Sequence, residues 1–139
     1  MNIDFFRYQS IFIFLINIIV IPYAFCSENM LGVWINSSVN NKKIFVFDFQ
    51  KNNRFELNIK KIDGKISKHY GEYFINKEKV PNTIDLKNIT NNTGPLFGII
   101  KTIDNNSILI SEFSKKWKLR PISFRKNNSR IFKKLIKEE

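Results

Sequence analysis

The chain has few of the residues that usually carry cross-links or metal chemistry. It contains one cysteine, one histidine, four prolines and five glycines. A single cysteine excludes an intrachain disulfide, and one histidine without partner ligands gives no zinc-binding cluster. Acidic residues are also scarce, 12 against 23 Lys and Arg, so the formal net charge is +11. We therefore expect no metal, no cofactor and a strongly basic surface.

A charge of this sign would ordinarily point to a polyanion partner. However, the abundant residues are Ile, Asn, Lys and Phe, whose codons are A/T-rich. Compositional drift would raise Lys and Asn everywhere in the chain without selection for binding. We therefore interpret most of the charge as a solvated surface, and nucleic acid is not an expected partner.

No catalytic signature accompanies the polar residues. His69 lies between Lys68 and Tyr70 and is interpreted as a surface or structural histidine. The carboxylates are scattered over different expected strands, and there is no Gly-x-Ser-x-Gly nucleophile motif. We expect a protein that is not an enzyme.

Residues 1–26 have the pattern of a secretory signal peptide. Arg7 supplies the positive charge, residues 11–21 form a short apolar run, and Pro22 ends that run before Cys26. The run is shorter than the roughly 20 residues of a membrane span. The pattern predicts cleavage after Cys26 and a periplasmic or secreted protein. Lipoprotein processing, in which Cys26 would be acylated, fits less well because Phe25 precedes it.

From residue 31 onward, short alternating apolar runs are separated by polar turns, which is the pattern of antiparallel β-structure. The clearest feature is a hairpin over 44–60, turning at Lys51-Asn52-Asn53. A close backbone approach or bulge is expected at Gly71. We predict about eight strands in a sandwich or closed barrel, at residues 31–36, 44–49, 54–60, 65–75, 83–86, 97–103, 108–113 and 117–124.

The last residues, 127–139, break this alternation. Ile131, Phe132, Leu135 and Ile136 recur at helical spacing with lysines between them. They predict a short basic amphipathic helix. Its apolar side could pack on the outside of the barrel, it could attach the protein to an anionic membrane surface, or the segment could remain a frayed, partly ordered tail.

The segment 31–124 resembles a family of uncharacterised, mostly exported bacterial proteins described as lipocalin-like. The similarity rests on motifs in a fixed order: Gly32-Val33-Trp34, the hairpin 49–57, Gly71-Glu72-Tyr73, Val80-Pro81 with the following residues to Leu86, Gly94-Pro95, the hairpin 100–110 and Arg120-Pro121-Ile122-Ser123-Phe124. The resemblance implies a small lipocalin-like (calycin-type) β-barrel over 27–126. It also implies that Trp34, following Gly32, packs under Arg120 and closes the barrel floor.

The residues expected inside this barrel are the best indication of function. They are Phe45, Phe47, Phe55, Leu57, Tyr73 and Trp117. Such side chains could line a cup for a small apolar or amphipathic ligand, or could simply fill the interior of so small a barrel. The sequence thus predicts a monomeric, exported, non-catalytic binding protein. The alternative is a protein-interaction module that meets an envelope or host partner through its rim and basic surface.

Overall fold

A computed structural model describes residues 30–36 and 43–136. These residues form an all-β, closed antiparallel barrel of eight strands. The predicted signal peptide 1–26 and Cys26 lie outside the described residues. The strands are β1 (Gly32–Asn36), β2 (Lys43–Gln50), β3 (Arg54–Lys61), β4 (Ile66–Asn76), β5 (Asn82–Lys87), β6 (Leu96–Asp104), β7 (Ser107–Ser111) and β8 (Ser129–Lys134).

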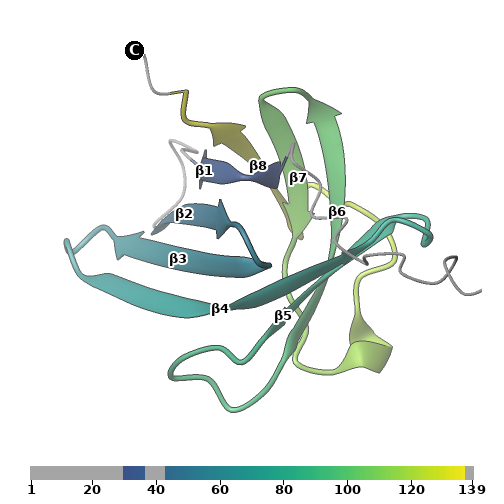
Figure 1. Cartoon of the computed structure of the whole chain (residues 1–139), viewed down its shortest axis with the longest axis horizontal. Helices are drawn as coiled ribbons and strands as arrows, with labels where there is room; N and C mark the ends of the chain where they lie inside the picture. Colours follow the sequence, from purple (N-terminus) through teal and green to yellow (C-terminus); the bar gives the residue numbers. More distant parts are fainter. Residues whose placement is uncertain (1–29, 37–42, 137–139) are drawn as a thin grey trace, which may run out of the picture.

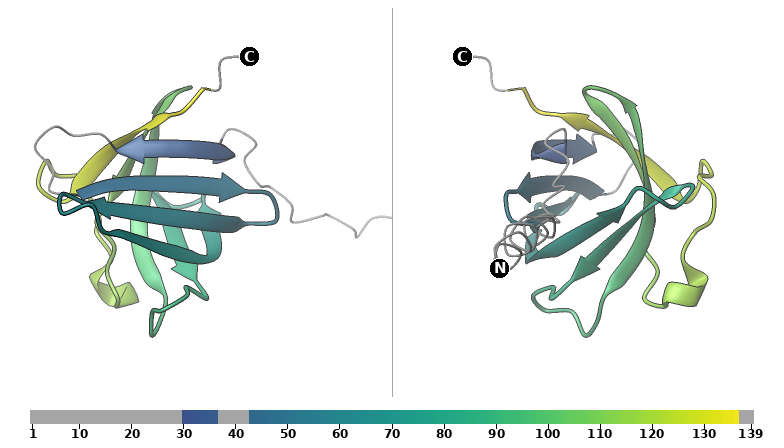
Figure 2. Two further views of the ribbon diagram at one scale, coloured as in Figure 1. Left: turned by 90° about the vertical axis from the view of Figure 1, so that its left-hand side faces the viewer. Right: turned by 45° about the vertical axis from the view of Figure 1, so that its right-hand side comes forward.

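Each strand pairs antiparallel with the next along the chain, and β8 then pairs with β1. Figures 1 and 2 show β8 crossing from the β7 side to lie beside β1. The closing seam is short, so side-chain and loop contacts extend it. The Asn36 side-chain amide donates to the carbonyl of Ile131 at 2.8 Å, and the Leu135 amide donates to the carbonyl of Val33 at 2.8 Å.

The predicted hairpin is confirmed as β2 and β3. Alternation places Phe45, Phe47 and Phe49 on the inner face of β2, where Phe47 and Phe49 are buried. Asn52 and Asn53 both adopt left-handed backbone angles, with φ of 60° and 57°, which Asn tolerates better than most residues. This turn sets the register that pairs Phe47 with Leu57 and Phe49 with Phe55.

The expected close approach at Gly71 is also found. A Cβ atom built there would lie 2.7 Å from the carbonyl oxygen of Lys87 and 2.9 Å from the ring of Phe55. Gly71 remains in regular register opposite Phe55, so the strand has no bulge at this position. The missing side chain is what lets β5 and the Phe55 ring approach β4.

Two predicted elements at the end of the chain are wrong. The strand expected over 117–124 is instead a 3-10 turn, Trp117–Leu119, within an irregular connection from β7 to β8. The helix expected over 127–139 is replaced by strand β8, so the barrel continues past residue 126; residues 137–139 lie outside the described part. The described residues still form eight strands, because β8 replaces the predicted last strand. It begins at Ser129, 12 residues after the predicted start at residue 117.

Candidate functional site

The structure places most of the predicted lining residues inside the barrel. Phe47, Phe55 and Tyr73 are buried, and Phe45 and Leu57 are half-buried against the core. Trp117 is the exception, because it lies on the outside with 65% of its surface exposed. Its predicted place in the interior is wrong because the segment around it is not a strand of the barrel.

Aromatic rings fill the middle of the barrel. Phe47 stacks on Phe49 with ring centres 5.1 Å apart. The centre of the Phe47 ring also lies 5.6 Å from that of Phe132, in an edge-on contact, and 6.0 Å from that of Phe55, in a tilted contact. Phe49 in turn meets Tyr73 at 4.8 Å. These rings divide the interior and leave a recess near each end, in contrast to a deep cup.

The first recess lies between β2, β3, β7 and β8 and has a volume of about 180 Å³. We call it the Phe45 recess. Its lining residues are Phe45, Phe47, Leu57, Ile110, Ser111, Glu112, Phe113, Arg130 and Phe132. Ligand pockets usually measure about 300–1,000 Å³, so a drug-sized molecule would not fit inside. An apolar cavity of about 150 Å³ nevertheless holds benzene. The Phe45 recess therefore has room for one ring or a short acyl chain.

A charged pair stands at the mouth of the Phe45 recess. Arg130 Nη2 on β8 lies 3.3 Å from Glu112 Oε1, which follows β7, and the guanidinium lies 5.0 Å from the centre of the Phe45 ring. The Arg130 and Glu112 side chains are 31% and 58% exposed. An ion pair this exposed contributes only about 0–1 kcal/mol, so it can open without a large cost.

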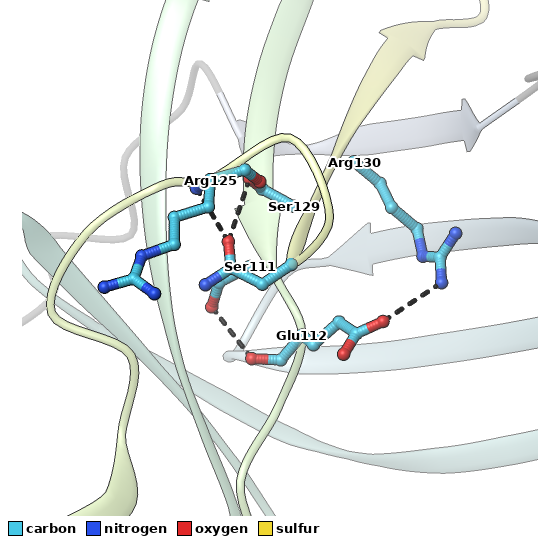
Figure 3. A network of polar contacts seen from close by, with 6 residues as sticks. Ser111, Glu112, Arg125, Ser129 and Arg130 are labelled. Carbon is cyan, nitrogen blue, oxygen red and sulfur yellow. Dashed lines mark hydrogen bonds and ion pairs between the residues drawn. The ribbon is translucent and has the colours of Figure 1, made fainter.

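The backbone beside this mouth is held by a polar network (Figure 3). Glu112 N–H donates to the carbonyl of Asn128, and the Arg125 amide donates to the Asn128 side-chain oxygen at 2.7 Å. The Ser129 hydroxyl donates to the carbonyl of Arg125. The Ser111 hydroxyl donates to the Glu112 carbonyl at 2.9 Å. Together these contacts fix the turn that leads into β8 and so position Arg130.

The second recess, of about 170 Å³, lies at the end closed by Trp34. Trp34 is buried, its indole N–H donates to the carbonyl of Met30 at 2.9 Å, and Lys134 Nζ lies 5.3 Å from its ring. Gly32, with φ of +116°, leaves space for the Lys134 side chain. Polar groups mix with apolar ones here. The Asn106 amide, donating to Asp104, is the main cause that holds the pKa of the Asp104 carboxyl below its usual range.

The expected stack of Arg120 on Trp34 is wrong. Arg120 lies on the outer face of β5 and β6, where its Nη2 is 2.7 Å from Asp85 Oδ1 and its guanidinium is 5.3 Å from the centre of the Phe97 ring. Its Nη1 also donates to the carbonyl of Gly98 at 3.3 Å. Lys134 on β8 takes the place over Trp34 because β8, and not the Arg120 segment, pairs with β1.

The connection from β7 to β8 covers part of this outer face and creates a third hollow. This outer groove, of about 520 Å³, runs between the β4–β5 connection and residues 117–122. Arg120 and Asp85 lie within it, together with Phe74, Val80, Trp117 and Ile122. The sequence alone indicates no role for the outer groove, since it predicts residues 117–122 in a strand and residues 78–81 in a separate connection.

Among the residues of the Phe45 recess that the sequence did not indicate, Arg130 and Phe132 come from β8. Both fell in the segment expected to be helical. Their alternation with exposed Ile131 would have been the signal for a strand. His69, by comparison, is half-buried on β4 with a ring nitrogen 3.3 Å from the carbonyl oxygen of Thr90.

Within residues 30–36 and 43–136, His, Asp and Glu form no group of three or more that could hold a metal ion. The same residues include no helix with the length and hydrophobicity needed to cross a lipid bilayer. Comparisons with protein-family models, with curated proteins and with solved structures each found no match to the chain.

Proposed function

We propose that this protein is a non-catalytic binding protein that holds the apolar end of a small amphipathic molecule in the Phe45 recess. The observation that carries the proposal is an almost wholly apolar hollow of about 180 Å³ with the Arg130–Glu112 pair at its mouth. An apolar group placed there leaves water on all sides except the mouth. Burial contributes about 0.8 kcal/mol for each CH₂ removed from water.

The size and polarity of the recess indicate the class of ligand. The Phe47 ring, backed by the Phe49 ring stacked on it, borders the hollow, so the apolar part is one ring or a short chain. A carboxylate at the other end would meet Arg130 in exchange for Glu112. Because the existing pair is exposed, this exchange loses little. We therefore propose a short fatty acid or an aromatic carboxylate as the ligand.

We also propose that the barrel is of the lipocalin-like type. Eight strands that pair in sequence order and close on themselves support this, as does a Gly-x-Trp motif at the start of the first strand. The position of Arg120 on the outside is a departure from the pattern that the resemblance implies.

The proposed place of action is the periplasm or the cell exterior, supported by the signal-peptide pattern of residues 1–26. Sequencing the N-terminus of protein recovered from the periplasm or medium is expected to give Ser27 as the first residue. Recovery of the intact N-terminus from the cytosol alone would contradict the proposal. An acylated Cys26 would point to the lipoprotein route.

The ligand proposal predicts that the protein binds hexanoate or benzoate. A titration monitored by NMR chemical shifts would measure this binding. The largest changes are expected at Phe45, Leu57 and Phe113. Leu57→Trp should fill the recess and weaken hexanoate binding at least about tenfold, because excluding two methylenes already removes ~1.6 kcal/mol.

The matched control is Ile75→Trp, which enlarges an aliphatic side chain at the other recess. It is expected to bind hexanoate as the wild type does. Equal binding by wild type and Leu57→Trp, or no binding by the wild type up to the solubility limit, would reject the Phe45 recess as the site. Thermal melts of both variants check that each is folded.

A further inference from the structure

Two connections on one side of the barrel expose large apolar side chains. Val80, in the β4–β5 connection, is 97% exposed, and Trp117, in the β7–β8 connection, is 65% exposed. Leu119 and Ile122 of the second connection are also exposed. Both connections lie on the right-hand side in Figure 1 and remain neighbours in the right-hand view of Figure 2. They meet across the outer groove, so their apolar side chains belong to one surface.

The same surface is strongly basic. Residues 115–122 contain three lysines and one arginine and no acidic residue. The β4–β5 connection adds Lys77 and Lys79 against a single carboxylate, Glu78. Arg120 is held by Asp85, but the lysines of this surface are exposed. An apolar surface ringed by positive charge is complementary to a partner that is negative outside and apolar beneath.

From this complementarity we propose that the protein docks on the surface of an anionic phospholipid bilayer through residues 115–122 and 77–81. Interfacial proteins insert apolar side chains about 5–10 Å into the headgroup boundary and place Lys and Arg against anionic headgroups. Tryptophan prefers the headgroup level. Here Val80, Trp117, Leu119 and Ile122 insert, and the lysines beside them contact phosphate groups.

The high exposure of the apolar side chains favours a bilayer over an acidic protein as the partner of this surface. Val80 and Ile122 are 97% and 84% exposed, so they stand at the rim of the outer groove and project outward from it. Lys118 Nζ lies 5.7 Å from the Trp117 ring centre, which keeps a positive charge at the level of the indole. None of these residues lines the Phe45 recess, so docking on a bilayer goes beyond the proposed function. A negative result in a vesicle-binding experiment would therefore leave the ligand proposal untouched, and the reverse also holds.

The fold also moves lipid contact away from the part of the chain where the sequence suggested it. Residues 129–134 form β8, and Phe132 faces the core, so an amphipathic helix is not available there. The basic apolar surface is supplied by the preceding connection, which the strand prediction had placed in the barrel wall.

The emission of Trp117 tests the proposal in the full chain. The chain has two tryptophans, and Trp34 is buried at 1% exposure, so changes on vesicle binding report Trp117. Vesicles of phosphatidylglycerol and phosphatidylcholine, 3:7, are expected to shift the emission to the blue, and vesicles of phosphatidylcholine alone are not. Lipids brominated on the acyl chain should quench the emission. High salt should reverse the binding. Trp117→Phe should lose the signal.

Charge reversal then identifies the surface. Lys115→Glu/Lys116→Glu/Lys118→Glu is expected to lower the vesicle partition coefficient at least about 100-fold, because the loss of each lysine near an anionic surface lowers it about fivefold. The control Lys60→Glu/Lys61→Glu/Lys68→Glu makes the same change in net charge on exposed positions of β3 and β4. It should stay within about threefold of wild type.

Three results would overturn the proposal. The first is no blue shift with anionic vesicles. The second is equal loss of affinity in both triple variants, which would mean net charge alone acts. The third is a blue shift produced as strongly by polyglutamate, without quenching by brominated lipid, which would assign the surface to an acidic polypeptide. Urea titration of each variant checks that the barrel is intact.

Discussion

Phe47→Ala is expected to lower the free energy of unfolding by about 3–5 kcal/mol, the usual cost of truncating a buried Phe. Phe47 is 2% exposed and contacts the rings of Phe49, Phe55 and Phe132, so its removal leaves a cavity bordered by three strands. Small domains are stable by about 5–15 kcal/mol in total. The variant should therefore be close to unfolding at room temperature, which urea denaturation followed by circular dichroism would measure.

The control for this prediction is Phe74→Ala on β4. Phe74 faces outward, is 42% exposed and has Lys87 Nζ 4.9 Å from its ring centre. Its truncation should cost only about 1–2 kcal/mol, because Phe74 buries less apolar area than Phe47 and its removal leaves no enclosed cavity. Similar losses in the two variants would contradict the filled interior, since they would mean that the Phe47 ring contributes no more than a surface ring.

Arg120→Ala is expected to lower the free energy of unfolding by about 2–3 kcal/mol. Removing one member of a buried ion pair costs about 3–5 kcal/mol, and the cost is reduced here because both side chains are 21% exposed. The buried Asp85 Oδ1 has no well-aligned hydrogen bond among the described residues, so the charge of Arg120 at 2.7 Å is its main compensation. Loss of packing on Phe97 adds to the effect.

Double-mutant cycles distinguish this arrangement from the one that the resemblance implied. Arg120→Ala and Asp85→Ala should be coupled by about 1–2 kcal/mol, whereas Arg120→Ala and Trp34→Phe should be additive within about 0.5 kcal/mol. Arg130→Ala, which breaks the exposed pair with Glu112, should cost less than about 1 kcal/mol. Strong coupling of Arg120 to Trp34 would show that the guanidinium lies at the barrel floor after all.

The part of the Phe45 recess built by β2 and β3 could be predicted from sequence. Phe45, Phe47 and Leu57 occupy every second position of two strands joined by an Asn-Asn turn, and both the period and the turn are local properties. Arg130, Phe132 and Ile110 could not be joined to them in the same way. They reach the recess only because β8 and β7 lie across the barrel from β3, a relation that no local spacing records.

The error at the end of the chain has a physical cause. Ile131, Phe132, Leu135 and Ile136 fit a helical stripe, and an isolated segment of this kind has no reason to prefer a strand. Without β8, strands β1 and β7 would each have one edge with unpaired backbone groups. A strand placed between them pairs with both edges, and β8 does so. Between Trp117 and Phe124, Pro121 lacks the amide hydrogen that a ladder needs, so that segment is a poorer candidate for the closing strand.

The sequence by itself determined the antiparallel β-structure that begins at residue 31 and runs to β7, which residues of β2 and β3 face inward, and that the chain is basic, because alternation, turn residues and charge act within a few residues of one another. Only the tertiary structure decided which strand closes the barrel, what covers Trp34 and where Arg120 lies. These depend on pairing between segments far apart, such as Asn36 with Ile131, 95 residues along the chain. Such pairing is chosen by competition among whole segments for the same free edges.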